Sequence, residues 1–156
     1  MEVWLNLLPW LILALLVACS AFFSASEAAL FYLTQEERNR LATGNRAQRA
    51  AALLLKNPDR LLSAVLFWNL VINITYFAIA AKIGLQLSQQ ASASPSTPFF
   101  FAAGSLLTII FCSEMLPKSI AVLSARHLAS LVSLPLSLAV RVLDPIMPGL
   151  HFVHLV

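Results

Sequence analysis

The chain has very little charge for its length of 156 residues, and it has few cysteines. Only 11% of its residues are Asp, Glu, Lys or Arg, while 60% are hydrophobic. Soluble globular domains carry about a quarter of their residues as charged side chains. The scarcity of charge therefore argues against a water-soluble domain and indicates membrane spans, and the length suits one compact domain.

The small number of cysteines and the placement of the basic residues exclude two further classes of protein. Cys19 and Cys112 both lie inside apolar runs, so we expect them to be small core residues and not a disulfide or a metal cluster. The net charge is +3, but most basic residues flank apolar stretches. No basic face with interspersed aromatic residues is present, which argues against nucleic-acid binding.

Three apolar stretches are long enough to cross a membrane as helices, at about residues 3–33, 61–83 and 98–123. A helical span needs about 20 residues. Because a bilayer offers no hydrogen-bond partners for the backbone, helices are favoured over strands. We therefore expect an all-α membrane protein with three transmembrane helices, built as a single domain over residues 1–156.

A polar segment over residues 34–60 separates the first two stretches. Thr34-Gln35-Glu36-Glu37 matches a capping box that starts a short helix, and Gly44-Asn45 ends it. A second short helix is expected to run to Asn57-Pro58, and Asp59 is expected to be the N-cap of the second span. The sequence thus predicts short helices between spans one and two.

The basic residues are distributed unevenly along the chain, which predicts its orientation. Residues 34–60 hold six of the ten Lys and Arg residues, whereas residues 84–97, an uncharged loop between spans two and three, hold none. The positive-inside rule then places the N-terminus outside and the C-terminus in the cytoplasm. Lys82, at the outer end of span two, is long enough to reach the interface.

The segment after the third span, residues 126–147, stays apolar but contains Pro135 and Pro145. We expect a bent juxtamembrane helix that lies at the inner interface. A short fourth span over residues 128–143 is the alternative. The chain ends in His151–Val156 without a polar tail, which is typical of one domain of a longer protein.

Each of the three spans carries polar residues along one face. Residues four apart share a helix face, and at about 1.5 Å per residue these side chains fall in or near the inner half of the membrane. The polar positions are Ser20 and Ser24 on span one, Asn69 and Asn73 on span two, and Ser113-Glu114 on span three. Such oxygen donors suit a hard cation such as Mg²⁺ or Na⁺.

The third span combines a carboxylate with a helix-breaking proline. Glu114 lies three residues before Pro117, and a charged group in hydrocarbon is costly and typical of an ion or proton path. Pro117 has no N–H, so in a regular helix the carbonyl of Ser113, four residues earlier, loses its donor. The sequence therefore predicts a charged oxygen next to a freed carbonyl oxygen.

Purely structural interpretations of these residues stay open. Serines pack membrane helices closely, asparagines hydrogen-bond across helices, and Pro117 can act only as a kink. Glu114 has Lys118 four residues on as an ion-pair partner. For Glu27 we prefer such a pair, with Lys118 or Arg126. The combination of oxygen donors on three separate spans nevertheless favours an ion site.

Three segments together resemble the transmembrane domain of the CorC/CNNM (cyclin M) family of magnesium transporters. They are Ser20-Ala-Phe-Phe-Ser24-Ala-Ser-Glu27-Ala-Ala-Leu30, Trp68-Asn69-Leu-Val-Ile-Asn73-Ile and Ser113-Glu114-Met-Leu-Pro117-Lys118-Ser-Ile-Ala121. The match covers nearly the whole chain in the same order and spacing. The chain departs from the family pattern at Ala25, Trp68 and Ser113, where the pattern has glycine, asparagine and glycine.

The resemblance implies three transmembrane helices and a juxtamembrane helical belt, assembled as a homodimer in the inner (plasma) membrane. It implies transport of Mg²⁺ and not an enzyme, with export coupled to Na⁺ entry, and full-length chains that continue into cytosolic ATP-binding CBS domains. The implied ligands of a dehydrated Mg²⁺ are Ser20, Ser24, Asn69, Asn73, Glu114 and the backbone of Ser113, supported by Pro117, Lys118 and Glu27.

Two other functions fit the same sequence. A non-transporting membrane anchor of a cytosolic Mg²⁺ or nucleotide sensor would use the polar faces only to hold its helices together. A carrier of another divalent cation, such as Co²⁺, would use the same oxygen donors for a different ion.

Overall fold

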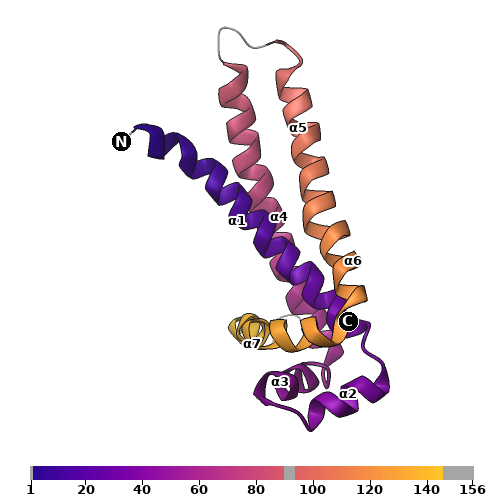
Figure 1. The fold of residues 1–156 in the computed structure, drawn as a ribbon. Helices are drawn as coiled ribbons and strands as arrows, with labels where there is room; N and C mark the ends of the chain where they lie inside the picture. Colours follow the sequence, from indigo (N-terminus) through magenta and orange to yellow (C-terminus); the bar gives the residue numbers. More distant parts are fainter. Residues whose placement is uncertain (1, 90–93, 146–156) are drawn as a thin grey trace, which may run out of the picture.

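The computed structural model describes residues 2–89 and 94–145, with side chains from Leu7 onward, and every regular element in these ranges is a helix. Three long rods run together (Figure 1). The first is α1 (Glu2–Phe31) and the second is α4 (Pro58–Ser88). The third consists of α5 (Thr97–Thr108), the π-helix η1 (Ile109–Met115) and α6 (Leu116–Leu123). The expected all-α fold with three long apolar helices is confirmed.

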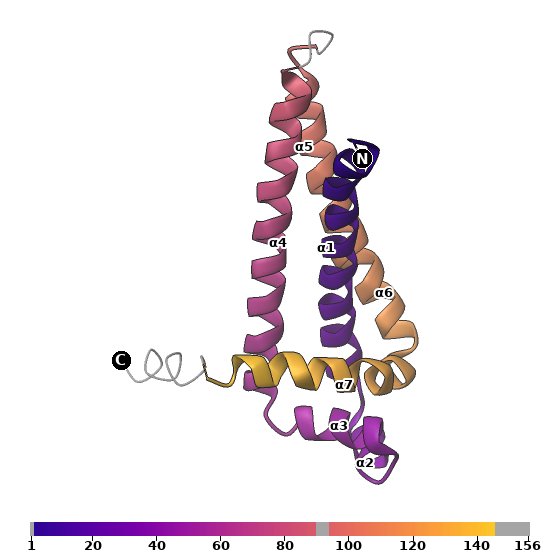
Figure 2. The same ribbon diagram turned by 90° about the vertical axis from the view of Figure 1, so that its left-hand side faces the viewer.

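Three shorter helices gather at one end of the rods. They are α2 (Gln35–Ala42), α3 (Arg46–Leu54) and α7 (Ala125–Leu143). By length and composition α7 qualifies as a fourth candidate span, but it runs crosswise to the rods in both ribbon views (Figures 1 and 2). This direction favours the juxtamembrane helix over the fourth-span alternative. Residues 146–147 of the predicted segment lie outside the described residues.

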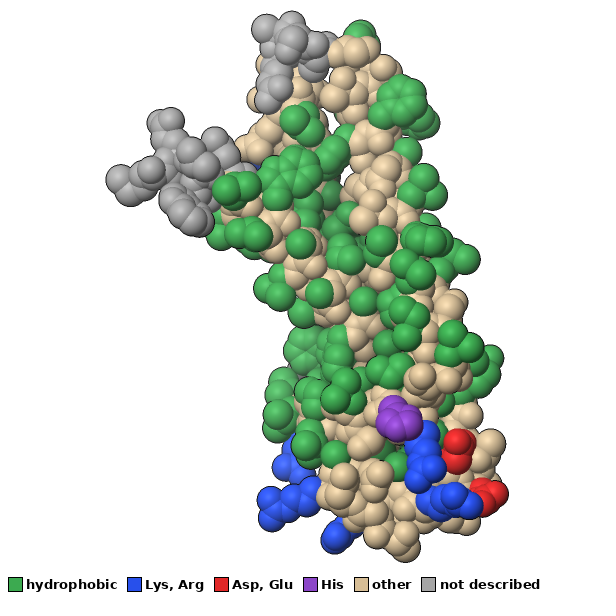
Figure 3. All heavy atoms as spheres, viewed as in Figure 1, with side chains coloured by type: hydrophobic (Ala, Val, Ile, Leu, Met, Phe, Trp, Pro, Cys, Tyr) green, Lys and Arg blue, Asp and Glu red, His purple; other side chains and the backbone are tan. Residues whose placement is uncertain are grey.

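Charged side chains mark the end of the molecule where these shorter helices lie. On the face drawn in Figure 3, the Lys, Arg, Asp and Glu side chains gather there, and hydrophobic side chains cover the rods. Exposed apolar residues along the rods include Leu11, Leu15, Leu70, Ile74, Leu107 and Phe111. An apolar surface this continuous belongs in lipid.

The predicted capping box at the start of α2 is confirmed. The N–H of Thr34 donates to the carboxylate of Glu37 at 2.9 Å, and the Thr34 hydroxyl accepts from the N–H of Glu37 at 3.3 Å. The backbone N–H of Thr34 first, and then its hydroxyl at 2.9 Å, donate to the carboxylate of the exposed Glu37 and hold its pKa below the ordinary value. A second capping box, between Asn45 and Gln48, starts α3.

The expected cap of the second span was wrong. Asn57 is the N-cap of α4, the helix begins at Pro58, and Asp59 lies in its first turn. The fixed φ of proline suits the first helical position, where its missing N–H costs nothing. At its other end α4 continues to Ser88 and not only to Ile83, so part of the expected loop is helical.

The larger of the two hydrophobic clusters in the described residues lies where the three rods meet α2, α3 and α7. Its fully buried side chains include Leu30, Leu41, Leu61, Val65 and Leu136. The buried Ser133 of α7 donates its hydroxyl to the carbonyl of Ala47, in α3, at 2.6 Å. This contact fixes α7 against the segment that connects the first two rods.

The predicted burial was wrong for one of the two cysteines. Cys19 is half-buried, as a small packing residue should be, but Cys112 is exposed. Lipid accepts apolar side chains as readily as a protein core does. An apolar run in a membrane protein therefore does not reveal which of its faces is buried.

The third rod changes its neighbour along its length. In its outer half α5 packs on α4, where Tyr76 donates its hydroxyl to the carbonyl of Ser105 at 3.2 Å. Gly84 of α4 is buried, and a Cβ there would come within 3.1 Å of the ring of Phe101. In its inner half η1 and α6 pack on α1 instead.

Trp68 connects α4 to both α1 and α7. Its ring stacks on that of Phe23 with centroids 6.3 Å apart, and its Nε1–H donates to the carbonyl of Ala139 at 3.1 Å. The residue that departs from the family pattern thus has a structural role, since it fixes α7 next to the polar positions of α4.

We expect Trp68→Phe to loosen α7 without unfolding the rods. The phenyl ring keeps the contact with Phe23, but the hydrogen bond to Ala139 is lost, which costs about 1 kcal/mol. Hydrogen–deuterium exchange over residues 125–143 should quicken by about fivefold, the rate ratio that corresponds to this energy. Trp10→Phe, at the far end of α1, is the matched control, and equal exchange in both variants would contradict the assigned role.

Candidate ion-binding site

The hydroxyl of Ser20 lies at the centre of a cluster of oxygen atoms between α1 and α4. Ser20 is fully buried, and its Oγ lies 2.8 Å from Oδ1 of Asn69 and 3.1 Å from Oδ1 of Asn73. A hydroxyl has a single hydrogen, so it donates to only one of these two carbonyl oxygens at a time. Both asparagines turn their side-chain oxygens, and not their NH2 groups, toward Ser20, so one amide oxygen receives no hydrogen from Ser20 and is available to a cation.

Ser24 adds an oxygen that the described residues leave unsatisfied. It lies one turn beyond Ser20 on the same face of α1, it is fully buried, and its Oγ has no hydrogen-bond partner within the described residues. An unsatisfied buried hydroxyl costs about 1–3 kcal/mol. The neighbouring Ser26 is equally buried but donates to the carbonyl of Phe22 at 2.6 Å. Ser24 is thus the position in this pair that is open to a ligand.

The third rod reaches the same part of α1 through η1. Ser113 is fully buried, and its Oγ lies 3.4 Å from the carbonyl oxygen of Val17, to which it donates. Val17 precedes Ser20 by less than one helical turn. Side chains from the two other rods therefore meet α1 within one helical turn, at Val17 and Ser20.

Glu114 follows Ser113 in the π-helix and is half-buried. It forms no hydrogen bond or ion pair with any residue of the described ranges. Lys118, its possible structural partner, lies instead 3.7 Å from the carboxylate of Glu27. The ion pair preferred for Glu27 from the sequence is confirmed, and it leaves the Glu114 carboxylate available.

The backbone around Pro117 differs from the regular helix assumed for it. Residues 109–115 form a π-helix, and the N–H of Leu116 bonds to the carbonyl of Phe111, five residues earlier. In this wider register the nitrogen of Pro117 faces the carbonyl of Cys112, whereas in the α register it faces that of Ser113. The missing N–H therefore acts on one of these two adjacent carbonyls, and the assignment to Ser113 stays a prediction.

A hollow of about 530 Å³ opens beside the Glu27–Lys118 ion pair. It is bounded by α1, α4 and α6, and its lining includes Tyr32, Leu62 and Ser119. Glu27 lies one turn beyond Ser24 on α1, in the direction of the charged end of the molecule. The hollow thus adjoins the inner end of the polar face on α1.

The chemistry of the cluster is that of a site for a hard cation. Its atoms are hydroxyl and amide oxygens, and the described residues hold no group of three or more His, Cys, Asp or Glu side chains that would suit a softer metal. Oxygen atoms without enough hydrogens are the ligands preferred by Mg²⁺, Ca²⁺ and Na⁺.

The structure brings together part of the predicted site. Ser20, Asn69 and Asn73 are in direct contact, and Ser113 is joined to the same stretch of α1. Ser24 lies one turn from Ser20 on α1, and Glu114 follows Ser113 in η1, but neither makes a polar contact with the cluster within the described ranges. Sequence reasoning missed the π-helix and the carbonyl of Val17. Pro117 was the available signal for irregular backbone, because a proline inside a helix removes one backbone hydrogen bond and disturbs the regular register.

Comparison with known proteins gives a family and several relatives. The family profile described as "Cyclin M transmembrane N-terminal domain" (CNNM) matches residues 11–153. A UPF0053 protein of Haemophilus influenzae is 32% identical over 140 residues, which are 88% of this chain and 32% of that protein. The UPF0053 inner membrane protein YfjD of Escherichia coli is 33% identical over 111 residues, 70% of this chain and 25% of that protein.

The family extends beyond bacteria. A chloroplastic DUF21 domain-containing protein of Arabidopsis thaliana is 31% identical over 136 residues, which are 87% of this chain and 20% of that protein. The chain spans a third or less of the length of these relatives, so they contain further sequence. The matched profile covers nearly all of the chain, including all three rods and the candidate site. The chain therefore belongs to the CNNM family and corresponds to its transmembrane N-terminal domain.

Proposed function

We propose that this domain carries Mg²⁺ across the inner membrane through the oxygen cluster between its three rods. The family is linked in general to Mg²⁺ transport. The observation that carries the proposal is that the side-chain oxygens of Ser20, Asn69 and Asn73 converge near the unsatisfied hydroxyl of Ser24. Helix packing alone would be served better by an asparagine NH2 group that donates to Ser20, whereas a bound cation requires the oxygens.

The proposed ligands have two roles: one supplies negative charge, and the others replace the water molecules around the ion. Glu114 supplies the negative charge, and Ser20, Ser24, Asn69 and Asn73 with the backbone carbonyl of Ser113 replace water around the ion. Mg²⁺ gives up water reluctantly and requires near-octahedral geometry. The contacts of α1 with α4 and η1 would hold these oxygens in position before the ion arrives, which lowers the cost of binding.

We further propose that transport is export coupled to Na⁺ entry. Na⁺ uses the same oxygen ligands as Mg²⁺, so competition for the Glu114 carboxylate would couple the two ions. The hollow beside Glu27 and Lys118 would form the inner approach to the site. The proposal includes a homodimer and cytosolic ATP-binding CBS domains in the full-length protein, and the greater length of the relatives leaves room for such domains.

Specific observations argue against the two rival functions. A non-transporting membrane anchor leaves the unsatisfied Ser24 hydroxyl without a purpose. A carrier for Co²⁺ would be expected to use nitrogen or sulphur ligands, and the cluster contains neither His nor Cys. Both observations favour Mg²⁺, and the following variants test the choice.

The sharpest variant is Ser24→Ala. Because the Ser24 hydroxyl has no hydrogen-bond partner among residues 2–89 and 94–145, its removal should leave the thermal stability of the ion-free protein unchanged or slightly higher. The same change removes a ligand, so Mg²⁺ affinity in a calorimetric titration should fall roughly tenfold or more. Ser26→Ala is the matched control, since it removes an equally buried hydroxyl that serves only the backbone of Phe22.

Ser26→Ala should bind Mg²⁺ as the unaltered protein does and lose some stability. If Ser24→Ala raises stability while Mg²⁺ affinity stays the same, the hydroxyl is not a ligand. If the unaltered protein shows no saturable Mg²⁺ binding at all, the anchor function is the better account.

Glu114→Gln tests the source of charge. The substitution keeps the shape of the side chain and removes its charge, so we expect Mg²⁺ affinity to fall by about a hundredfold and Mg²⁺ efflux from proteoliposomes to stop. Glu36→Gln, at an exposed position on α2 paired with Arg40, removes one charge far from the rods and should change neither quantity. Unchanged affinity and efflux in Glu114→Gln would disprove the proposed mechanism.

A competition series among cations tests the identity of the ion. A near-octahedral site built from the proposed oxygen ligands should prefer Mg²⁺ and Mn²⁺ over Ca²⁺, which takes more ligands at longer distances. Added Na⁺ should raise the apparent Kd for Mg²⁺. The measurement is displacement of bound Mn²⁺, followed by electron paramagnetic resonance. Displacement by Co²⁺ at concentrations about a hundredfold below those of Mg²⁺, beyond the usual order of affinities, would support the Co²⁺ carrier instead.

A further inference from the structure

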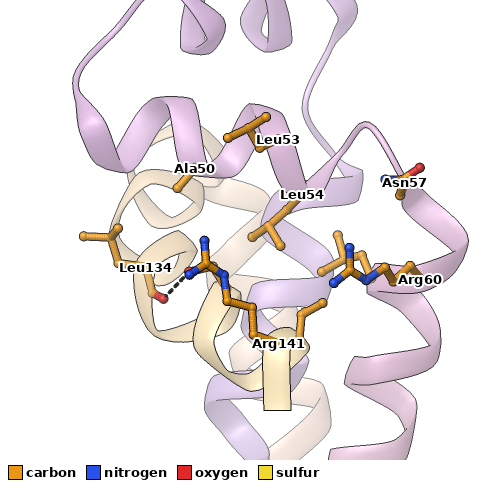
Figure 4. Close-up of a pocket in the computed structure, with 10 residues that line it drawn as sticks. Ala50, Leu53, Leu54, Asn57, Arg60, Leu134 and Arg141 are labelled. Atoms are coloured by element: carbon orange, nitrogen blue, oxygen red, sulfur yellow. Dashed lines mark hydrogen bonds between the residues drawn. The ribbon is translucent and has the colours of Figure 1, made fainter. Parts of the chain in front are cut away.

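A second concave site lies at the charged end of the molecule, apart from the ion cluster. It is a cavity of about 260 Å³ between α3, the start of α4 and the end of α7 (Figure 4). Arg60, which lines it, is nine residues before Asn69 on α4, or roughly 14 Å along the helix axis. No step of the proposed ion transport uses this cavity.

The cavity has an apolar wall and two arginines. Leu53 and Leu54 of α3, Leu61 of α4 and Leu134 of α7 supply the apolar surface. Arg60 and Arg141 enter from different helices, and both side chains point toward Leu54 (Figure 4). Such a combination of hydrocarbon and guanidinium groups fits a ligand with an apolar part and an anionic part.

The charge balance at the cavity is positive. Arg60 is paired with Asp144, whereas Arg141 has no acidic partner within the described residues. Two guanidinium groups and one carboxylate leave one positive charge that is not compensated there. A guanidinium binds phosphate through two parallel hydrogen bonds, which makes phosphate the anionic group that it matches best.

The apolar wall of the cavity continues onto the outer face of α7. Leu131, Leu134, Leu138 and Val142 are spaced along one face of this helix and are all more than half exposed. Leu134 belongs both to this face and to the cavity. The cavity therefore opens onto an apolar surface long enough to contact a hydrocarbon chain.

The position of the cavity matches the head-group region of a membrane. α7 lies crosswise at the end of the rods, among the basic side chains (Figures 2 and 3), and the positive-inside rule places this end on the cytoplasmic side. The lipid leaflet on that side carries anionic phospholipids, and basic pockets at this level bind their head groups.

We propose that this cavity binds one anionic phospholipid of the inner leaflet. Its phosphate pairs with Arg141. The phosphate also pairs with Arg60, where it replaces the carboxylate of Asp144. One acyl chain lies along Leu131, Leu134 and Leu138 of α7. The lipid would then join α3, α4 and α7, the three elements that meet at the cavity.

The test is native mass spectrometry of the chain, purified in a neutral detergent and titrated with phosphatidylglycerol or phosphatidylcholine. We expect about one phosphatidylglycerol per chain to be retained, with phosphatidylcholine retained at least about tenfold less strongly. Arg141→Gln should lower retention of phosphatidylglycerol about tenfold. Asp144→Asn frees Arg60 and should raise retention several-fold.

Matched controls separate the cavity from the general charge of this end. Arg46→Gln, on the exposed side of α3, removes the same charge as Arg141→Gln, and Glu36→Gln removes the same charge as Asp144→Asn. Neither control should change retention. Equal effects in control and cavity variants, or equal retention of the two lipids, would overturn the proposal. Displacement of the lipid by millimolar inorganic phosphate would also overturn it, because it would identify a site for soluble phosphate.

Discussion

The arrangement of this domain depends on the stretch of α1 from Val17 to Ser24, where polar groups of all three rods meet inside an apolar bundle. In lipid, the hydrophobic effect does not favour one packing of apolar helices over another, because apolar side chains contact acyl chains as favourably as they contact each other. Hydrogen bonds between this stretch and Asn69, Asn73 and Ser113 therefore provide specificity that the apolar residues cannot: Ser20 donates to the asparagines, and Ser113 donates to Val17. The same groups form the candidate ion site, so the contacts that orient the rods also position the oxygens.

The sequence predicted the fold well because its strongest signals are physical requirements of a membrane. The all-helical structure, the three long apolar helices and the capping box at Thr34 followed from length, backbone satisfaction and hydrogen bonding at helix ends. The predictions of a buried Cys112 and of Asp59 as the cap of α4 were wrong. The burial of Cys112 depends on which face of its helix contacts the protein, and the start of α4 depends on how Pro58 fits the first helical position. Hydropathy encodes neither.

The site was predicted in composition more than in geometry. Helical spacing placed Ser20 and Ser24 on one face and Asn69 and Asn73 on another, and the structure brings Ser20 to both asparagines. The pairing of Glu27 with Lys118 was also foreseen. The π-helix was not, because its wider hydrogen-bond register has no composition of its own. Trp68 could not be interpreted either, since its partner Ala139 is 71 positions away in the sequence.

The change of neighbour along the third rod has a mechanical consequence. The π-helix takes up more residues per turn than the α-helix, so it shifts the angular phase of α6 relative to α5. Because of this shift, α5 contacts α4, whereas η1 and α6, farther along the same rod, contact α1. Tightening of η1 to an α-helix would rotate the two halves against each other, and Glu114 lies within the segment that would turn. The hydrogen-bond register of η1 therefore determines how Glu114 is oriented relative to α5 and α6.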